Sequence, residues 1–266
     1  MNSHGFSLIF DCDGVLADTE RFGHLPAFNA AFVELGVPMS WSEDDYARLV
    51  QIGGGKERIE AALAEVGVDV DPTVVGDYVK SIHAVKTRIY RGMVDDGVMP
   101  PRAGVSRLIC EALAEGWNVA VASTSAVESV RSVLGGAVGD AGAEIPVFAG
   151  DMVPHKKPAP DIYQLAIAEL AADPSATVVI EDSAVGLRAA RAAGLACVVT
   201  PSSYTHGEDF SDASAVVSTL GDAAEPTTVL ADPYGVGFAE QVDIASLRRL
   251  LSLRNGCAQM LAKEAQ

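Results

Sequence analysis

The stretch SLIFDCDGVL, residues 7–16, decides how the rest of the chain is interpreted. Its apolar start is typical of a buried strand, and it ends in two aspartates, Asp11 and Asp13, one residue apart. Aspartate and glycine often mark the turn after a strand. The stretch alone therefore leaves four interpretations open: a plain turn, a metal site, a calcium loop, or a nucleophile for phosphoryl transfer.

Composition narrows the class of protein. The chain has 266 residues, 49% of them hydrophobic, which suits one large domain or two smaller ones. Its formal net charge of −17 argues against nucleic acid or an anionic membrane as a partner, because both would be repelled. No apolar stretch approaches the roughly 20 residues of a membrane span, and no secretory signal is visible. We therefore expect a cytoplasmic protein.

From about residue 104 onward, short β-rich runs alternate with helical patterns. Alternation of this kind predicts an α/β fold with a doubly wound, Rossmann-like parallel sheet, in which SLIFDCDG forms a central strand. The tail after about residue 220 is rich in turn-forming residues. The remaining strands are expected at 118–124, 146–151, 177–183 and 196–202, and the helices at 104–116, 125–136, 157–171, 183–194 and 244–256.

The character of the chain changes between residues 20 and 95, where helical patterns replace the β-branched runs. The simplest interpretation is a small all-helical insertion after the first strand, over residues 19–95. Residues 1–18 and 96–266 would then form the α/β core, and Pro100-Pro101 would mark the return to it.

Polar residues stand where the predicted strands end, and ligands bind outside the carboxyl ends of strands in such sheets. Each has an ordinary alternative: Ser125 as a helix N-cap, Lys157 as a surface charge, Asp182 or Ser183 as a turn or cap residue. Polar residues follow one predicted strand end after another along the chain, and this pattern is better explained if they all line one crevice at the carboxyl edge of the sheet. The set is Asp11, Asp13, Ser123, Thr124, Lys157, Glu181 and Asp182.

Phosphoryl transfer fits this set. Asp11 and Asp182 can supply the oxygen ligands that Mg²⁺ prefers, and a carboxylate can attack phosphorus. A lysine neutralises charge on the transferring group, and a second carboxylate can act as acid and base. A calcium loop is excluded because the glycine comes fourth rather than sixth in the motif. A dinucleotide-binding site is also excluded, because no GxGxxG motif follows the first strand.

Four motifs resemble the signature motifs of the haloacid-dehalogenase-like hydrolases: DCDGVL, the serine of VAVASTS, the lysine of KKPAPD, and IEDS. The resemblance implies that Asp11 is the nucleophile and Asp13 the general acid and base. It also implies that Ser123, the Thr124 backbone N–H and Lys157 hold the phosphoryl group. An aspartate at position 13 is similar to the pattern of phosphatases and phosphomutases.

The same resemblance implies a magnesium site. Mg²⁺ would be bound by Asp11, the Asp13 backbone carbonyl and Asp182, with Glu181 in or near the outer shell.

The helical insertion resembles the cap of the branch that contains β-phosphoglucomutase and phosphoglycolate phosphatase. DTERFGHLPAFN, QIGGGKER and VVIEDSAVGL look like the CbbY-like group, which is similar to phosphatases of xylulose 1,5-bisphosphate. We expect a phosphorylated sugar as substrate, with xylulose 1,5-bisphosphate yielding xylulose 5-phosphate. The alternatives are a β-phosphoglucomutase-like phosphomutase, a phosphoglycolate-type phosphatase, and a catalytically inactive protein that binds a sugar phosphate. Plant relatives enter chloroplasts, so the stroma is expected if a transit peptide has been removed.

The cap is expected to select the substrate. Lys56 and Lys86 are candidates for a distal phosphate, with Arg58 a weaker one, and Glu20 and His24 would reach hydroxyls or the leaving group. Lys86 and Arg58 could equally be solvated helix faces, and His24 could merely cap or pack. The glycines 53–55 would let backbone N–H groups approach the substrate, with Gly54 and Gly55 as the expected contacts.

We expect a monomer, because the sequence shows no long exposed apolar seam.

Overall fold

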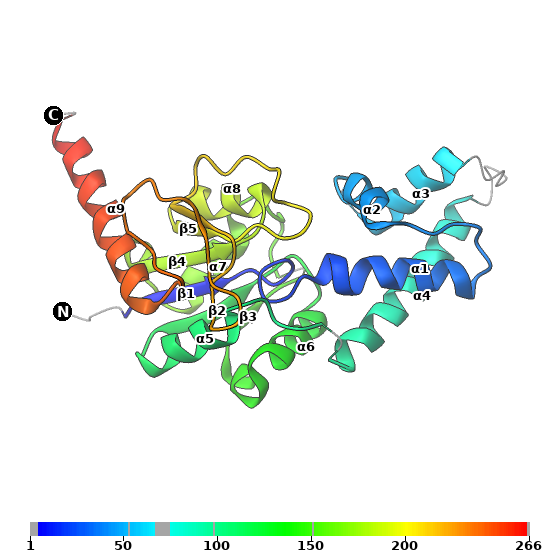
Figure 1. Cartoon of the computed structure of the whole chain (residues 1–266), viewed down its shortest axis with the longest axis horizontal. Helices are drawn as coiled ribbons and strands as arrows, with labels where there is room; N and C mark the ends of the chain where they lie inside the picture. The colour runs from blue at the N-terminus through cyan, green and yellow to red at the C-terminus, as the bar shows by residue number, and fades with distance from the viewer. Residues whose placement is uncertain (1–4, 53, 67–74, 98, 151, 265–266) are drawn as a thin grey trace. The chain divides into compact units, whose positions relative to one another are not determined.

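The computed structural model describes residues 5–52, 54–66, 75–97, 99–150 and 152–264. The chain divides into two compact units, Met1–Asp18 with Pro100–Gln266, and Thr19–Met99 (Figure 1). Within the described ranges, no helix is both long and apolar enough to cross a membrane.

The first unit is built on one seven-stranded sheet with the order β3-β2-β1-β4-β5-β6-β7. All neighbouring pairs are parallel except β6 and β7, which are antiparallel. The predicted α/β fold is confirmed, with the first strand near the centre of the sheet. The strands are β1 (Ser7–Phe10), β2 (Asn118–Ala122), β3 (Val147–Phe148), β4 (Thr177–Glu181), β5 (Ala196–Val199), β6 (Ala215–Val217) and β7 (Val229–Ala231).

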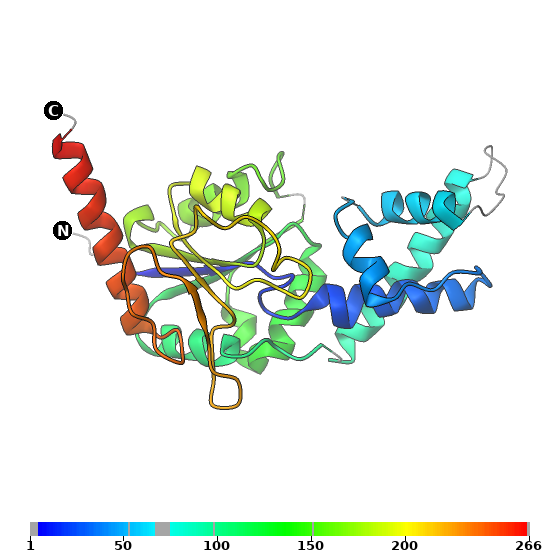
Figure 2. The same ribbon diagram turned by 45° about the horizontal axis from the view of Figure 1, so that its top comes forward.

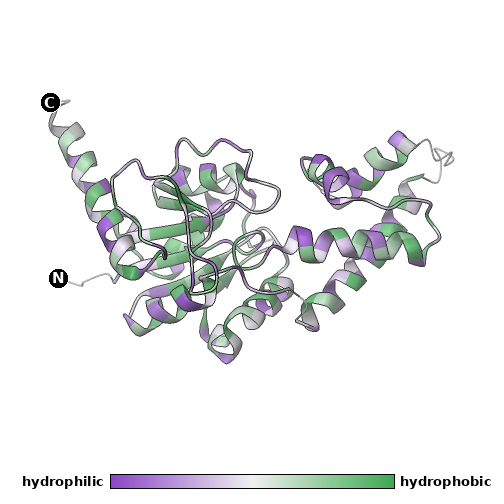
Figure 3. Cartoon of the chain, in the orientation of Figure 1, coloured by the Kyte–Doolittle hydropathy of each residue, from purple (hydrophilic) through white to green (hydrophobic). Residues whose placement is uncertain are grey.

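The central strands are buried on both faces. Their residues are mainly apolar and are coloured green in Figure 3. Ile9 of β1 pairs with Ala120 of β2 and Val179 of β4, and these three residues face the same core cluster. Helices α7 (Asp161–Glu169) and α8 (Ala184–Ala192) pack over that face of the sheet. Helices α5 (Val105–Ala114), α6 (Val127–Val138) and α9 (Ile244–Glu264) cover the other face (Figure 2).

The two strands at the far edge were not predicted from the sequence. β7 falls inside the stretch after residue 220 that reads as turn-rich. Its three residues, VLA, are apolar but exposed, and a run this short shows neither the alternation nor the length from which a strand is predicted. Helix α9 begins at Ile244 as predicted but extends to Glu264, eight residues beyond the predicted end at 256.

The second unit is all-helical. Trp41 packs against Phe28, Phe32 and Tyr46, with ring centroids 4.8 to 5.9 Å away. Helices α1 and α4 pack against each other, with α4 crossing α1 at an angle (Figure 1). The helices are a short π-helical turn (Glu20–His24), α1 (Leu25–Glu34), α2 (Glu43–Leu49), α3 (Gly55–Val66) and α4 (Val75–Asp95).

Candidate active site

Lys157 joins the carboxyl ends of three adjacent strands. Its Nζ donates to Asp11 Oδ1 at 2.6 Å, to the Ala122 carbonyl at 3.0 Å and to Glu181 Oε1 at 2.7 Å. The sheet register explains the meeting point, because Asp11 extends the β1–β4 ladder by donating its N–H to the Ile180 carbonyl. The Lys157 side chain is only 6% exposed, so its alternative interpretation as a surface charge is wrong.

Glu181 is held from two further directions. The Tyr163 hydroxyl donates to Glu181 Oε1, the oxygen that also accepts from Lys157, and the Lys157 Nζ lies 4.8 Å from the centre of the Tyr163 ring. A Cβ on Gly186 would come within 2.0 Å of the Glu181 carboxylate, so only glycine fits there. Glu181 and Lys157 are therefore fixed as a pair.

Asp182 completes a buried acidic trio with Asp11 and Glu181, whose carboxylate oxygens lie within 4.8 Å of one another. Gly14 lies directly against it: a Cβ there would be 2.1 Å from Asp182 Oδ2, and the Gly14 φ of +79° also favours glycine. On the other side, the Thr205 hydroxyl approaches Asp182 Oδ2 at 3.4 Å.

The trio carries an excess of buried negative charge. Burial raises the pKa of Asp11 to about 7; Lys157 opposes this effect, while Glu181 and Asp13 add to it. Burial, together with Asp11 and Glu181, also raises the pKa of Asp182. Burial alone would lower the pKa of Lys157, but Asp11 and Glu181 outweigh it and raise that pKa, so Lys157 stays charged.

Asp13 takes a different partner. The Ser125 hydroxyl donates to Asp13 Oδ2, while the Ser125 backbone N–H donates to Ser123 Oγ at 3.1 Å. Ser123 is buried at the end of β2, and Thr124 is exposed beside it. Ser125 is not the N-cap that its position also allowed, because Ala126 precedes the first residue of α6. Its contact with Asp13 was not predicted.

In the helical unit, Glu20 and Arg58 meet at the hydroxyl of Tyr46. Tyr46 donates to Glu20 Oε2, and Arg58 Nη1 lies 2.8 Å from the Tyr46 oxygen and 3.4 Å from Glu20 Oε2. Arg58 also donates to the carbonyls of Ile52 and Val50, so it is not a solvated helix face. Tyr46 was not predicted as a site residue, because an aromatic residue at helical spacing is more often part of the core.

His24 and Lys86 form a second cluster in this unit. Lys86 Nζ donates to His24 Nδ1 at 2.7 Å and lies 4.8 and 4.9 Å from the centres of the Phe28 and Tyr90 rings. The His24 ring stacks on Tyr90. Lys86 is buried, so its interpretation as a solvated helix face is wrong.

The glycine-rich segment is less enclosed. Gly54 is exposed with a φ of +98°, and Lys56 is exposed at the start of α3. Gly55 lies against the His83 ring, 3.0 Å from where its Cβ would stand. Gly53 lies outside the described residues.

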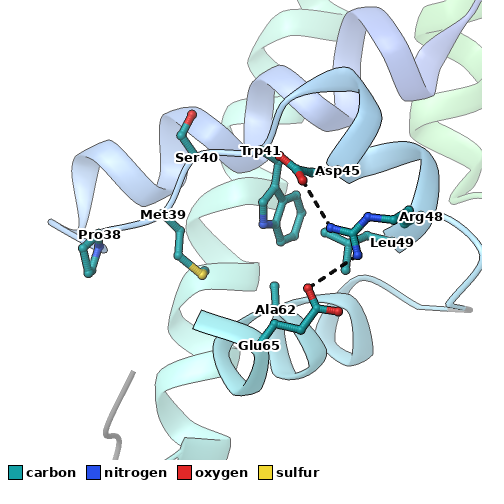
Figure 4. Close-up of a pocket in the computed structure, with 9 residues that line it drawn as sticks. All are labelled: Pro38, Met39, Ser40, Trp41, Asp45, Arg48, Leu49, Ala62 and Glu65. Atoms are coloured by element: carbon teal, nitrogen blue, oxygen red, sulfur yellow. Dashed lines mark hydrogen bonds and ion pairs between the residues drawn. The ribbon is translucent and has the colours of Figure 1, made fainter. Parts of the chain in front are cut away.

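A cavity of about 350 Å³ also lies within the helical unit (Figure 4). Trp41 and Met39 line it, and Arg48 crosses its edge between Asp45 and Glu65. None of the predicted substrate residues contributes to this lining.

Comparison with known proteins identifies the family. Residues 7–194, more than half of the chain, match the haloacid dehalogenase-like hydrolases. The chain belongs to this family.

Individual relatives of this hydrolase point to one group within the family. A CBBY-like protein of Arabidopsis thaliana is 45% identical over 224 residues, which cover 82% of this chain and 70% of that protein. Protein CbbY of Cereibacter sphaeroides is 39% identical over 218 residues, covering 81% and 93%. The crystal structure of CbbY from Rhodobacter sphaeroides matches with a TM-score of 0.67 and 39% identity over 83% of this chain and 98% of that one. The chain is therefore an enzyme, a hydrolase of the phosphatase kind.

The acidic trio fits the divalent metal ion that such hydrolases generally use. Lys157 brings one positive charge to three buried carboxylates, and the raised pKa of Asp11 and Asp182 reflects the imbalance. Oxygen donors of this kind suit a hard divalent cation, whose charge would restore the balance. The residues present can therefore hold such an ion.

Proposed function

We propose that this protein is a Mg²⁺-dependent phosphatase of small phosphorylated sugars that forms an aspartyl-phosphate on Asp11. The observation that carries the proposal is the position of the Asp11 carboxylate. It is buried at a strand end, with Oδ1 held by Lys157 and two further carboxylates beside it. This arrangement orients a carboxylate nucleophile and supplies the charges that a phosphoryl group requires.

Each step assigns a task to a residue of this chain. Asp11 Oδ2 attacks phosphorus while the bond from phosphorus to the sugar oxygen breaks, and Asp13 protonates that leaving oxygen. Water then gives a proton to Asp13 and attacks phosphorus, which breaks the bond to Asp11 and releases inorganic phosphate. Ser125 orients Asp13 by donating to its Oδ2.

Ser123, the Thr124 backbone N–H and Lys157 would hold the phosphoryl oxygens. Mg²⁺ would be bound by Asp11, the Asp13 backbone carbonyl and Asp182, and it would neutralise negative charge on the phosphoryl group. Glu181 would act from the outer shell, since its Oε1 accepts from Lys157 and Tyr163 and its Oε2 accepts from the Asp182 backbone N–H at 3.3 Å.

The proposed substrate is xylulose 1,5-bisphosphate. Its support is the 39% identity to the Rhodobacter sphaeroides CbbY, which was also solved as a mutant in complex with that compound. Glu20, His24, Arg58 and Lys86 are the proposed substrate contacts of the helical unit, joined by the Gly54-Gly55 backbone and Lys56. Lys86 would bind the phosphate that is not transferred.

A substrate panel tests the proposal. Phosphate release with Mg²⁺ is measured for xylulose 1,5-bisphosphate, ribulose 1,5-bisphosphate, phosphoglycolate and β-glucose 1-phosphate with its bisphosphate primer. We expect selective release from xylulose 1,5-bisphosphate, lost by on the order of 10⁴-fold or more in Asp11→Asn. Weak release throughout, with conversion of β-glucose 1-phosphate to the 6-phosphate, would show a phosphomutase instead. Selective release of phosphate from phosphoglycolate would show that the substrate is not a sugar bisphosphate.

A further inference from the structure

Arg102 is the most extensively bonded arginine near the site, although the proposed chemistry assigns it no task. Its four terminal N–H groups meet four backbone carbonyls. Nη1 donates to the carbonyls of Gly14 and Thr200, the latter at 2.7 Å, and Nη2 donates to those of Pro201 at 2.8 Å and Ser218 at 3.2 Å. The guanidinium thus joins loops that follow three different strands, β1, β5 and β6.

Two of these loops enclose Asp182. Gly14 lies against the Asp182 carboxylate, as the 2.1 Å approach of an added Cβ shows. Pro201 leads into the loop whose Thr205 hydroxyl approaches Asp182 Oδ2 at 3.4 Å, and Thr205 also accepts the backbone N–H of Ser202 at 2.8 Å. One side chain therefore fixes the backbone on both sides of Asp182.

Only arginine can make this connection. Its planar guanidinium points separate N–H groups in fixed directions, whereas a lysine carries all its donors on one nitrogen. A lysine at position 102 would keep the charge but could not reach all four carbonyls at once.

We propose that Arg102 is a positioning residue that holds the Asp182 carboxylate in the orientation that a divalent cation requires. Arg102 acts through Gly14 and the 200–205 loop and touches neither the metal nor the substrate. The inference rests on the proposed function, because it takes Asp182 as a metal ligand. Replacing residues that orient metal ligands costs about 10- to 100-fold in metal affinity.

The chain provides a matched control in Arg107. This arginine also bonds backbone carbonyls, those of Leu220, Gly221 and Val242, each at 2.9 Å from Nη2. Those carbonyls belong to the C-terminal segment, and within the described part of the chain no hydrogen bond links them to Asp182. Arg107→Lys therefore removes a comparable set of hydrogen bonds but leaves those that hold Gly14 and the 200–205 loop.

The experiment measures Mn²⁺ binding to the full chain by electron paramagnetic resonance, with thermal unfolding recorded in parallel. We expect Arg102→Lys to weaken Mn²⁺ binding about 10-fold or more, and to raise the Mg²⁺ concentration for half-maximal phosphate release by a similar factor. Arg107→Lys should bind Mn²⁺ within about twofold of the wild type, at a comparable loss of thermal stability. Equal Mn²⁺ affinities in the two variants, whether both normal or both weakened, would overturn the proposal.

Two further variants complete the design. Asp182→Asn should lose Mn²⁺ binding; if it binds normally, the proposed metal site is wrong, which is distinct from a failure of Arg102 alone. Should Arg102→Lys not fold, Thr205→Val removes the hydroxyl that lies 3.4 Å from Asp182 Oδ2 and accepts the Ser202 backbone N–H at 2.8 Å. A weakening of Mn²⁺ binding by about 10-fold is expected there, because the loop held by Arg102 then loses its contact with Asp182, and unchanged affinity would count against the proposal.

Discussion

Two buried lysines, one in each unit, are held in different ways. Lys157 is bound by two carboxylates, Asp11 and Glu181, at 2.6 and 2.7 Å. Lys86 contacts an imidazole nitrogen and two aromatic faces, which attract a cation by a lone pair and by ring quadrupoles. The same residue type therefore belongs to a fixed ionic network in the α/β unit and to an aromatic cluster in the helical unit.

This difference separates two expected roles. Lys157 is expected to be needed for the chemistry of any substrate, because its partners include the proposed nucleophile. Lys86 is proposed to bind the phosphate that is not transferred, so its replacement should weaken activity only toward substrates that carry a second phosphate.

The largest effect is expected for Lys157→Met. The change leaves Asp11 and Glu181 facing each other without their shared cation, which should lower the unfolding free energy of the metal-free protein by about 3 kcal/mol. We expect kcat to fall on the order of 10²- to 10³-fold for every substrate, p-nitrophenyl phosphate included. Urea unfolding and steady-state kinetics measure the two effects. A loss confined to bisphosphate substrates would contradict the assignment.

A smaller and more selective effect is expected for Lys86→Met. We predict that KM for xylulose 1,5-bisphosphate rises about 10-fold or more, because a charged contact to a phosphate is lost, while kcat for p-nitrophenyl phosphate changes less than about twofold. Lys80→Met is the matched control, since Lys80 lies on the same helix, with a 68% exposed side chain paired to Asp77. Equal losses for both substrates would place Lys86 in a structural role.

The smallest effect is a pH dependence of stability that the buried carboxylates around Lys157 should dominate, against an opposing contribution from His83, whose pKa burial lowers. The pKa of Asp11 is raised from its ordinary value to about 7, so the folded protein binds this proton more tightly than the unfolded chain. Stability should therefore fall as the pH rises from about 4 to about 7, and the raised pKa of Asp182 acts in the same direction.

Thermal unfolding in EDTA measures this fall. The fall in melting temperature with rising pH should be smaller in Asp11→Asn, which lacks the titrating carboxyl group. It should also be smaller in the wild type with Mg²⁺ in place of EDTA, because the cation competes with the proton. A melting temperature of the metal-free protein that rises steadily over the same pH range would show that Asp11 is not the controlling group.

The sequence was most informative where structure follows from burial and topology. The apolar run before Asp11 predicts a buried strand, and parallel strands place their carboxyl ends at one edge, so the meeting of Asp11, Lys157 and Asp182 follows from the chain order. The strand β7 escaped prediction because a three-residue run in a turn-rich segment shows neither the alternation nor the length on which the inference depends.

Contacts made by single side chains over long sequence separations could not be predicted. Ser125 reaches Asp13 across 112 positions, and Arg102 reaches Ser218 across 116. Neither residue belongs to a periodic pattern, and a serine or an arginine near a loop usually has an ordinary surface role. Only the folded backbone shows which carbonyls and carboxylates come within hydrogen-bond distance.

The central claim is that the Asp11 carboxylate attacks phosphorus, and trapping the covalent intermediate tests it most directly. The protein is mixed with xylulose 1,5-bisphosphate and Mg²⁺, quenched in acid, reduced with borohydride and mapped by mass spectrometry. A phosphorylated aspartate is reduced to homoserine, and we predict that conversion at position 11, absent without substrate and absent in Asp11→Asn. Turnover with no conversion at position 11 under single-turnover conditions, or conversion at another carboxylate, would contradict the account.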